Sequence, residues 1–385
     1  MAEDRPTAGV QGESSLQGST ARGQWGSSPR TSTAARTAGE LVRYGLGVAI
    51  GLVVLVLLFG RRGEFVAAVR QVSDARPGWV AAAIGAEALS LLAYARLQQH
   101  VLRLAGTVVP LPGLFLVTLA NDAIASTVPG EPAVSSGYRY RYYRRRGSSA
   151  AGAGWTVFTI LVAQAVGMSL VLLTGVVAAL VASAAAGGAG ASPVGIGVTA
   201  LGLLVVVGSG AVLVRRDLVL SLASRLAGRL RRRAGRRPGG LLVRIEATLA
   251  RMRDIPLSPR STAHVIVLAT AVWVGDFLCL LCGFGAVHAA VPWRGVLLAY
   301  GAAQVAGSLP IVPGGLGIVE GSLAVILVGY GASRVPAVSA VVAYRIVNYW
   351  LAIAVGWISV AMLALQHRRR RRPASDRAAQ PDVTG

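Results

Sequence analysis

The stretch SLPIVPGGLGIVEGSL, residues 308–323, separates two apolar runs and contains two prolines and four glycines. Proline and glycine are the poorest helix formers, and Glu320 is costly to place in a lipid environment. A broken backbone is tolerated at membrane depth only where it faces protein or a water-filled cavity. The stretch therefore predicts a turn buried inside a membrane protein.

The composition indicates an all-α integral membrane protein. Of 385 residues, 54% are hydrophobic and 14% are charged, whereas soluble domains carry roughly 25% charged residues. Apolar runs of about 18 residues are candidate transmembrane helices. The runs are 41–60, 79–97, 111–128, 155–184, 193–214, 262–288, 295–312, 316–331 and 337–366.

The net charge of +22 comes from arginine alone, because the chain contains no lysine. A phosphate-binding P-loop and a Schiff-base mechanism are thereby excluded. The arginines gather at the ends of apolar runs, which favours the positive-inside rule over nucleic-acid binding. We expect contacts with anionic phospholipids and no nucleic acid.

Arginine distribution predicts the topology. Three basic segments are expected in the cytoplasm, namely 139–147, 215–260 and 367–385, and the uncharged loop 185–193 is expected outside. Tracing the runs then gives about six full spans and two re-entrant broken segments, 111–138 and 295–331, which enter from opposite faces. We expect a protein of the cell membrane with both termini in the cytoplasm. The loop 61–76 opposes this trace, because it would lie outside with four arginines.

Three regions follow from this pattern. Residues 1–38 are polar and predict a disordered cytoplasmic tail. Residues 39–366 form the membrane domain, and 367–385 a basic cytoplasmic tail. Within the membrane domain, 215–260 predicts an arginine-rich amphipathic segment at the membrane surface, with a solvated basic linker as the alternative.

The two broken segments resemble each other. Asn121 and Gln304 precede a Pro-Gly break by eight or nine residues. Paired interrupted segments of this kind form the substrate site in inverted-repeat transporters. The sequence similarity between the halves is weak, and a chance resemblance stays the alternative.

Polar residues inside the runs are candidate functional residues, because burying them is costly. The ionisable ones are Glu87, Asp122, Asp276, Glu320 and Arg345, and the amides are Asn121, Gln164, Gln304 and Asn348. We expect Glu320 to stabilise the positive end of the helix after the glycines and to pair with Arg345. Glycine amides there could hold a phosphate. Arg345 and Asn348 are expected on one helix face. The alternative is that these groups form hydrogen bonds between helices.

A family resemblance rests on VPGGLGIVEGSL, residues 312–323, and YRIVNYWL, residues 344–351. They resemble the membrane region of lysylphosphatidylglycerol synthases, the multiple peptide resistance factor family, and its stand-alone flippase-like relatives. The resemblance covers roughly 40–366, and its first-half motif is looser, so Glu131 is not equated with a family site residue. The matching positions are Pro313–Gly317, Glu320, Arg345, Tyr349–Trp350, Asn121, Pro129–Gly130, Tyr138–Arg139 and Arg144–Arg146.

The resemblance implies a flippase-like module that moves a phospholipid or lipid-linked headgroup between leaflets. Because 385 residues leave no room for the soluble aminoacyl-transferase domain, we expect a transport module without enzyme activity, cofactor or metal. A lipid-modifying enzyme is a candidate partner. The predicted headgroup-binding residues are Glu320, Arg345, Asn348, Pro313, Gly314, Gly315, Gly317, Asn121, Asp122, Pro129, Gly130, Arg139 and Gln304.

Two other functions are weighed against translocation. A membrane enzyme acting on lipid-linked substrates would need acidic residues in an outer loop, where the sequence offers Glu64 and Asp74, far apart. Neither H-E-x-x-H nor G-x-S-x-G occurs, and the four histidines are scattered. In the third alternative, a structural or regulatory membrane partner, the buried charges would stabilise packing.

Overall fold

The computed structural model is helical throughout the residues that it describes, which are 70–127, 131–185, 258–308 and 313–371, with a few isolated positions between 208 and 251. No strand occurs in this part of the chain. The helices are α3 (Pro77–Leu104), α4 (Leu111–Thr127), α5 (Glu131–Arg145), α6 (Ala150–Ala185), α10 (Pro259–Ala286), α11 (Val296–Gly307), the 3-10 turn η1 (Pro313–Gly315), α12 (Ile318–Gly329), α13 (Arg334–Arg345), the π-helix η2 (Ile346–Leu351) and α14 (Ala352–Arg371).

Four helices are long and apolar enough to cross a membrane: Pro77–Leu104, Ala150–Ala182, Pro259–Ala286 and Arg334–Leu365. The last runs through α13, η2 and α14 without a break. These four match predicted runs, which confirms an all-helical, multi-pass architecture. The predicted spans 41–60 and 193–214, the tails and nearly all of 215–260 lie outside the described residues, so the count of six full spans stays a prediction.

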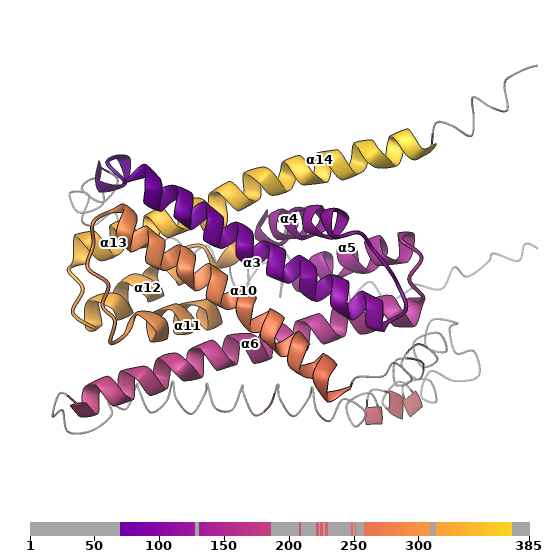
Figure 1. Cartoon of the computed structure of the whole chain (residues 1–385), viewed down its shortest axis with the longest axis horizontal. Coiled ribbons are helices and arrows are strands. Elements are labelled where there is room, and N and C mark those ends of the chain that lie inside the picture. Colours follow the sequence, from indigo (N-terminus) through magenta and orange to yellow (C-terminus); the bar gives the residue numbers. More distant parts are fainter. Residues whose placement is uncertain are drawn as a thin grey trace, which may run out of the picture. The chain divides into compact units, whose positions relative to one another are not determined.

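Two helical hairpins lie where the sequence predicts broken segments. In the second, α11 and α12 have 12 residues each, or about 18 Å, which is little more than half of a hydrocarbon core of about 30 Å. The two helices pack against each other, and α4 packs against α5 in the same way. Figure 1 shows both hairpins within the helical bundle.

The hairpins open toward opposite ends of the bundle (Figure 1). At one end, a Cβ on Gly113 would lie 3.8 Å from Arg146 Nη2, so the beginning of α4 lies beside the end of α5. At the other end, the same construction on Gly295 meets the Tyr330 ring, where the second hairpin starts and finishes. Re-entry of the two segments from opposite faces of a membrane stays a prediction, with which the opposite directions of the hairpins agree.

The packing follows the pattern that an inverted repeat would give. Helices α3 and α10 form the central contact, α4 packs on α14, and α11 packs on α6. In chain order, α3 to α6 therefore correspond to α10 to α14, with each hairpin resting on the last helix of the other half. Which end faces the cytoplasm stays a prediction.

Small residues let these helices approach closely. A Cβ on Gly167 of α6 would lie 2.8 Å from the Ala269 backbone of α10, and one on Gly275 would lie 2.9 Å from Ser90 of α3. A Cβ on Gly356 of α14 would meet the Leu119 carbonyl of α4. Close backbone contact at small residues is a main source of helix association in membranes.

Candidate functional site

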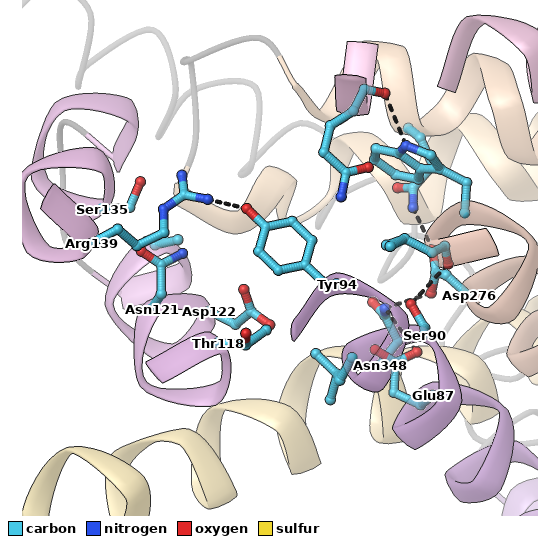
Figure 2. A pocket seen from close by; sticks show the side chains of 16 residues that line it. Glu87, Ser90, Tyr94, Thr118, Asn121, Asp122, Ser135, Arg139, Asp276 and Asn348 are labelled. Carbon is cyan, nitrogen blue, oxygen red and sulfur yellow. Dashed lines mark hydrogen bonds between the residues drawn. The ribbon is translucent and has the colours of Figure 1, made fainter. Parts of the chain in front are cut away.

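A polar cavity of about 330 Å³ lies between both halves of the bundle, and we term it the central cavity. Its walls come from α3, α4, α5, α6, α10, α11 and η2, and Figure 2 shows the side chains that line it. A cavity lined by this many polar groups is unusual at membrane depth and marks a candidate site. The polar and ionisable lining residues are Glu87, Ser90, Tyr94, Thr118, Asn121, Asp122, Ser135, Arg139, Gln164, Trp273, Asp276, Gln304 and Asn348.

Asp276 of α10 is the main hydrogen-bond acceptor on one side of the cavity. Its Oδ2 accepts from Tyr300 Oη at 2.6 Å and from Gln304 Nε2 at 2.7 Å, and its Oδ1 accepts from Asn348 Nδ2 at 2.6 Å. Tyr344 Oη lies 3.0 Å from both oxygens. Four donors from α11, α13 and η2 thus compensate the desolvation of one carboxylate.

Glu87 of α3 lies beside Asp276 on the same side of the cavity (Figure 2). The residue is 8% exposed. Asn348 Nδ2 is 3.5 Å from Glu87 Oε2 as well as 2.6 Å from Asp276 Oδ1, so one amide bridges both carboxyl groups. The two central helices therefore each present a carboxyl group to the cavity.

Arg139 of α5 lies on the other side of Tyr94 (Figure 2). It is 8% exposed, and its Nη1 donates to Tyr94 Oη. Among the described residues, Arg139 Nε and the nearby Asn121 Oδ1 are buried without a hydrogen-bond partner. Asp122 lines the same cavity as Arg139. A donor and an acceptor are thus open to a ligand.

The burial of Arg139 corrects one expectation. The sequence places it in the cytoplasmic basic segment 139–147, with surface arginines that gather headgroups. The structure buries Arg139 in the cavity and leaves Arg141, Arg144 and Arg145 exposed. The reason is packing, since α5 turns one face toward α4.

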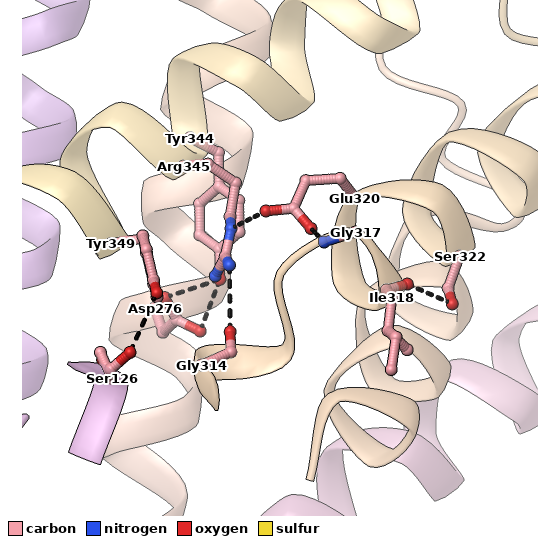
Figure 3. Close-up of polar contacts among 10 residues, drawn as sticks. All are labelled: Ser126, Asp276, Gly314, Gly317, Ile318, Glu320, Ser322, Tyr344, Arg345 and Tyr349. Atoms are coloured by element: carbon pink, nitrogen blue, oxygen red, sulfur yellow. Dashed lines mark hydrogen bonds and ion pairs between the residues drawn. The ribbon is translucent and has the colours of Figure 1, made fainter. Parts of the chain in front are cut away.

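Glu320 and Arg345 form a second polar group next to the cavity, shown in Figure 3. Arg345 Nε lies 2.6 Å from Glu320 Oε1, and Arg345 Nη2 donates to the Gly314 carbonyl at 3.1 Å. The guanidinium also lies 4.3 Å from the centre of the Tyr349 ring. The predicted Glu320–Arg345 pair is confirmed, and it ties η1 and α12 to α13.

Glu320 also occupies the start of α12. Its Oε2 accepts a hydrogen bond from Gly317 N at 2.7 Å, which satisfies an amide that the helix itself leaves open. This confirms that Glu320 stabilises the positive helix end. It also corrects the idea that this amide is free for a phosphate, because the carboxylate of the chain already takes it.

The glycines of this turn have conformational roles. Gly314, Gly315 and Gly317 have φ angles of 63°, 62° and 81°, in the left-handed region that other residues rarely adopt. A Cβ on Gly314 would also meet the Tyr349 ring. The motif PGGLG is therefore required for the turn itself.

Replacing Gly314 with alanine should destabilise the second hairpin. The substitution adds left-handed strain of about 1–2 kcal/mol and a clash with the Tyr349 ring. We expect a lower melting temperature of the purified protein in detergent, measured by scanning fluorimetry. Gly329→Ala is the matched control, since a Cβ there meets nothing within 4 Å. Equal stability of the two variants would contradict this role.

The structure divides the predicted site residues into two groups. Lining the central cavity are Asn121, Asp122, Arg139, Gln304 and Asn348. The second group forms the Glu320–Arg345 pair or lies beside it, and consists of Pro313, Gly314, Gly315, Gly317, Glu320 and Arg345. Pro129 and Gly130 lie outside the described residues.

Arg345 and Asn348 do not share a partner, although the sequence places them on one helix face. The chain changes to a π-helix at Ile346, which is wider than an α-helix and changes the direction of each side chain. Arg345 consequently pairs with Glu320, while Asn348 reaches Asp276. A π-helix of this kind is frequent at functional sites.

Two cavity residues, Ser90 and Tyr94, and the nearby Tyr300 escaped the sequence analysis because it considered ionisable and amide side chains and not hydroxyl groups. Ser90 and Tyr94 lie three and seven residues after Glu87, and Tyr300 lies four residues before Gln304. Spacing of three or four residues puts such groups on one helix face. A search for polar residues at helical spacing from each buried carboxylate would have found them.

Comparison with known proteins gives two findings. The family described as lysylphosphatidylglycerol synthase TM region matches residues 44–356. An uncharacterised protein, slr0712 of Synechocystis sp. (strain ATCC 27184 / PCC 6803 / Kazusa), is 38% identical over 89 residues. That alignment covers 23% of this chain and 27% of the cyanobacterial protein, or about a quarter of its length.

Proposed function

The chain belongs to the lysylphosphatidylglycerol synthase transmembrane-region family, and from this premise we propose that it translocates an anionic phospholipid by passing the headgroup through the central cavity. Membership of the family indicates a multi-pass membrane protein that handles lipid. The finer statement, translocation, rests on the chemistry of the cavity.

Arg139 is the observation that supports the proposal most directly. Its Nε is buried without a partner among the described residues, close to an unpartnered oxygen of Asn121. Leaving a buried donor unsatisfied costs about 1–3 kcal/mol. A phosphodiester offers charged acceptor oxygens that pair strongly with a guanidinium. A headgroup phosphate at Arg139 would therefore recover that cost.

The hairpins suggest how the headgroup passes. They open toward opposite ends of the bundle, and residues from α4, α5 and α11 line the cavity between them. Rocking of one repeat against the other around a fixed site is the usual mechanism of inverted-repeat transporters. Because the chain has no lysine for a P-loop, the energy would come from a gradient or a partner.

Glu320 and Arg345 take a different part in this proposal from the one that the sequence favours. Arg345 is already bound by Glu320, the Gly314 carbonyl and the Tyr349 ring. We assign the pair to holding the second hairpin in place, and the phosphate contact to Arg139. The end of the bundle that carries the exposed Arg141, Arg144 and Arg145 would face the cytoplasm, where the membrane leaflet is rich in anionic lipid.

The test is lipid translocation in proteoliposomes, with Arg139→Gln as the variant. Wild-type protein should move fluorescent phosphatidylglycerol between leaflets faster than protein-free vesicles, and Arg139→Gln should fall to the vesicle background. Arg103→Gln is the control, because Arg103 is exposed at the end of α3. The readout is the fraction of fluorescence bleached by dithionite.

Three results would contradict the proposal. Wild-type protein of intact fold that moves none of the phospholipids tested would leave a structural or regulatory partner as the better function. Chemical modification of the lipids in the same vesicles, seen by mass spectrometry, would favour a membrane enzyme. If Arg139→Gln still translocates lipid, Arg139 does not bind the headgroup phosphate.

A further inference from the structure

We propose that Glu87 is a proton-binding residue of the central cavity, which takes up one proton when an anionic headgroup binds and releases it when the headgroup leaves. This inference rests on the proposed function, since it couples proton binding to headgroup translocation. It makes the protein a symporter of a proton and a phospholipid.

The geometry begins with the two carboxyl groups. Asn348 Nδ2 lies 3.5 Å from Glu87 Oε2 and 2.6 Å from Asp276 Oδ1, so one amide joins the two carboxyl groups across the contact between α3 and α10. Two ionised carboxylates held this close disfavour each other's charge. The pair is therefore a site that can take up one proton.

The donors around the pair favour Glu87 as the group that takes up the proton. Asp276 accepts hydrogen bonds from Tyr300, Gln304, Tyr344 and Asn348. Glu87 has the 3.5 Å contact with Asn348. Four donors stabilise the ionised form of Asp276, whereas the ionised form of Glu87 has much less support.

The carboxyl groups that share the cavity with Glu87 oppose a second negative charge there. They are Asp276 of α10 and Asp122 of α4. From α6, the cavity is lined by the neutral Gln164. Of the cations on neighbouring elements, Arg345 of α13 is paired with Glu320, and Arg139 of α5 lies on the other side of Tyr94 (Figure 2).

The cavity is a ligand site and not merely an acidic cluster. Asn121 and Arg139 are 6% and 8% exposed, and each has a buried polar atom without a partner among the described residues. Both line the same cavity as the carboxyl pair. The basic side is open to an anion, and the acidic side can take up the proton that accompanies it.

Electrostatics then couples the two events. The cavity contains three carboxyl groups, on Glu87, Asp122 and Asp276, against the single guanidinium of Arg139. An incoming phosphodiester adds one negative charge, which a proton on Glu87 offsets. Because linkage is reciprocal, headgroup binding strengthens proton binding by the factor by which the proton strengthens headgroup binding.

The proton step is simple to balance. On binding, a hydronium ion from the water in the cavity gives its proton to the Glu87 carboxylate, which forms the O–H bond and leaves a water molecule. On release, that bond breaks and the proton returns to water on the side to which the cavity is then open. One proton and one monoanionic headgroup move together, so the transfer carries no net charge across the membrane.

The first test detects the proton without any transport assay. Infrared spectra of the solubilised protein with short-chain phosphatidylglycerol bound should contain the C=O band of a protonated carboxylic acid, which is absent before the lipid binds and which Glu87→Gln removes. Asp74→Asn, at an exposed carboxylate, is the control and should keep the band. A band that survives in Glu87→Gln, or wild-type protein without one, would overturn the inference.

The second test measures coupling with short-chain phosphatidylglycerol as the probe. Binding to the solubilised wild-type protein should take up one proton per lipid from a weakly buffered solution, and binding to Glu87→Gln should take up none. In proteoliposomes, one pH unit should shift the leaflet ratio by up to about tenfold toward the alkaline side. In Glu87→Gln, the pH gradient should not change the leaflet ratio of the lipid.

The outcomes separate the two proposals. Proton uptake without movement of lipid would reject translocation and keep Glu87 as a proton site linked to an anion site. Translocation that is insensitive to pH gradients, with no proton uptake on binding, would reject the role of Glu87 and leave translocation standing.

Discussion

Replacing Arg345 with alanine should lower the free energy of unfolding by about 3–5 kcal/mol, the usual cost of removing one partner from a buried ion pair. Arg345 is 6% exposed and contacts η1, α12 and η2 at once, through Gly314, Glu320 and Tyr349. Its loss leaves the Glu320 carboxylate and the Gly314 carbonyl without a cation. We expect reduced yield of folded protein and a much lower melting temperature in detergent.

Arg334→Ala is the matched control, because Arg334 begins the same helix and is exposed. The double variant Glu320→Gln, Arg345→Gln should recover part of the lost stability, since it leaves no uncompensated charge. If the loss of stability in the double variant equals the sum of the losses in Glu320→Gln and Arg345→Gln measured singly, the two residues act independently. An Arg345→Ala variant as stable as Arg334→Ala would contradict the structural role assigned to the pair.

The Glu320–Arg345 pair could be predicted because its logic is largely local. Glycines that end one helix and a carboxylate three residues into the next specify a helix start, and Arg345 was the obvious buried cation for that carboxylate. The fold class was predictable for a similar reason, since helix length and apolar composition decide which segments span a membrane. Tertiary contacts were not needed for either inference.

Arg139 shows where local pattern was misleading. A run with five arginines within eight residues, 139–146, is usually solvated. Yet Ser135, Arg139 and Tyr143 are spaced by four residues and form the buried face of α5. Helical periodicity contained this signal, but the number of arginines concealed it. The polar face is buried because α4, itself a short hairpin helix, covers it.

The hydrogen-bond partners of Asp276 could not be predicted from the sequence. Its four partners are 24 to 72 residues away in the chain, and they meet only because α11 enters the bundle as a hairpin and η2 widens the last span. A single sequence shows that Asp276 is costly to bury. It does not show which helices supply the donors.

Replacing Asp276 with alanine should therefore be as damaging as replacing Arg345, and it should also abolish lipid translocation. The four donors on α11, α13 and η2 would lose a charged acceptor together. Each buried donor left unsatisfied costs about 1–3 kcal/mol, although neighbouring effects do not add simply. Tyr300→Phe, which removes one donor and leaves three, should cost about 1.5–3 kcal/mol.

Asp276→Asn separates the structural from the electrostatic part of this effect. The amide keeps one acceptor oxygen toward Tyr300 and Gln304, and Asn348 can present its own oxygen to the new NH₂ group. The fold should then survive, with a melting temperature far closer to wild type than that of Asp276→Ala. The negative charge that holds the Glu87 proton is gone, so translocation should lose its response to a pH gradient. If Asp276→Asn keeps that response, Asp276 serves only packing, and the proton on Glu87 must be held by another group.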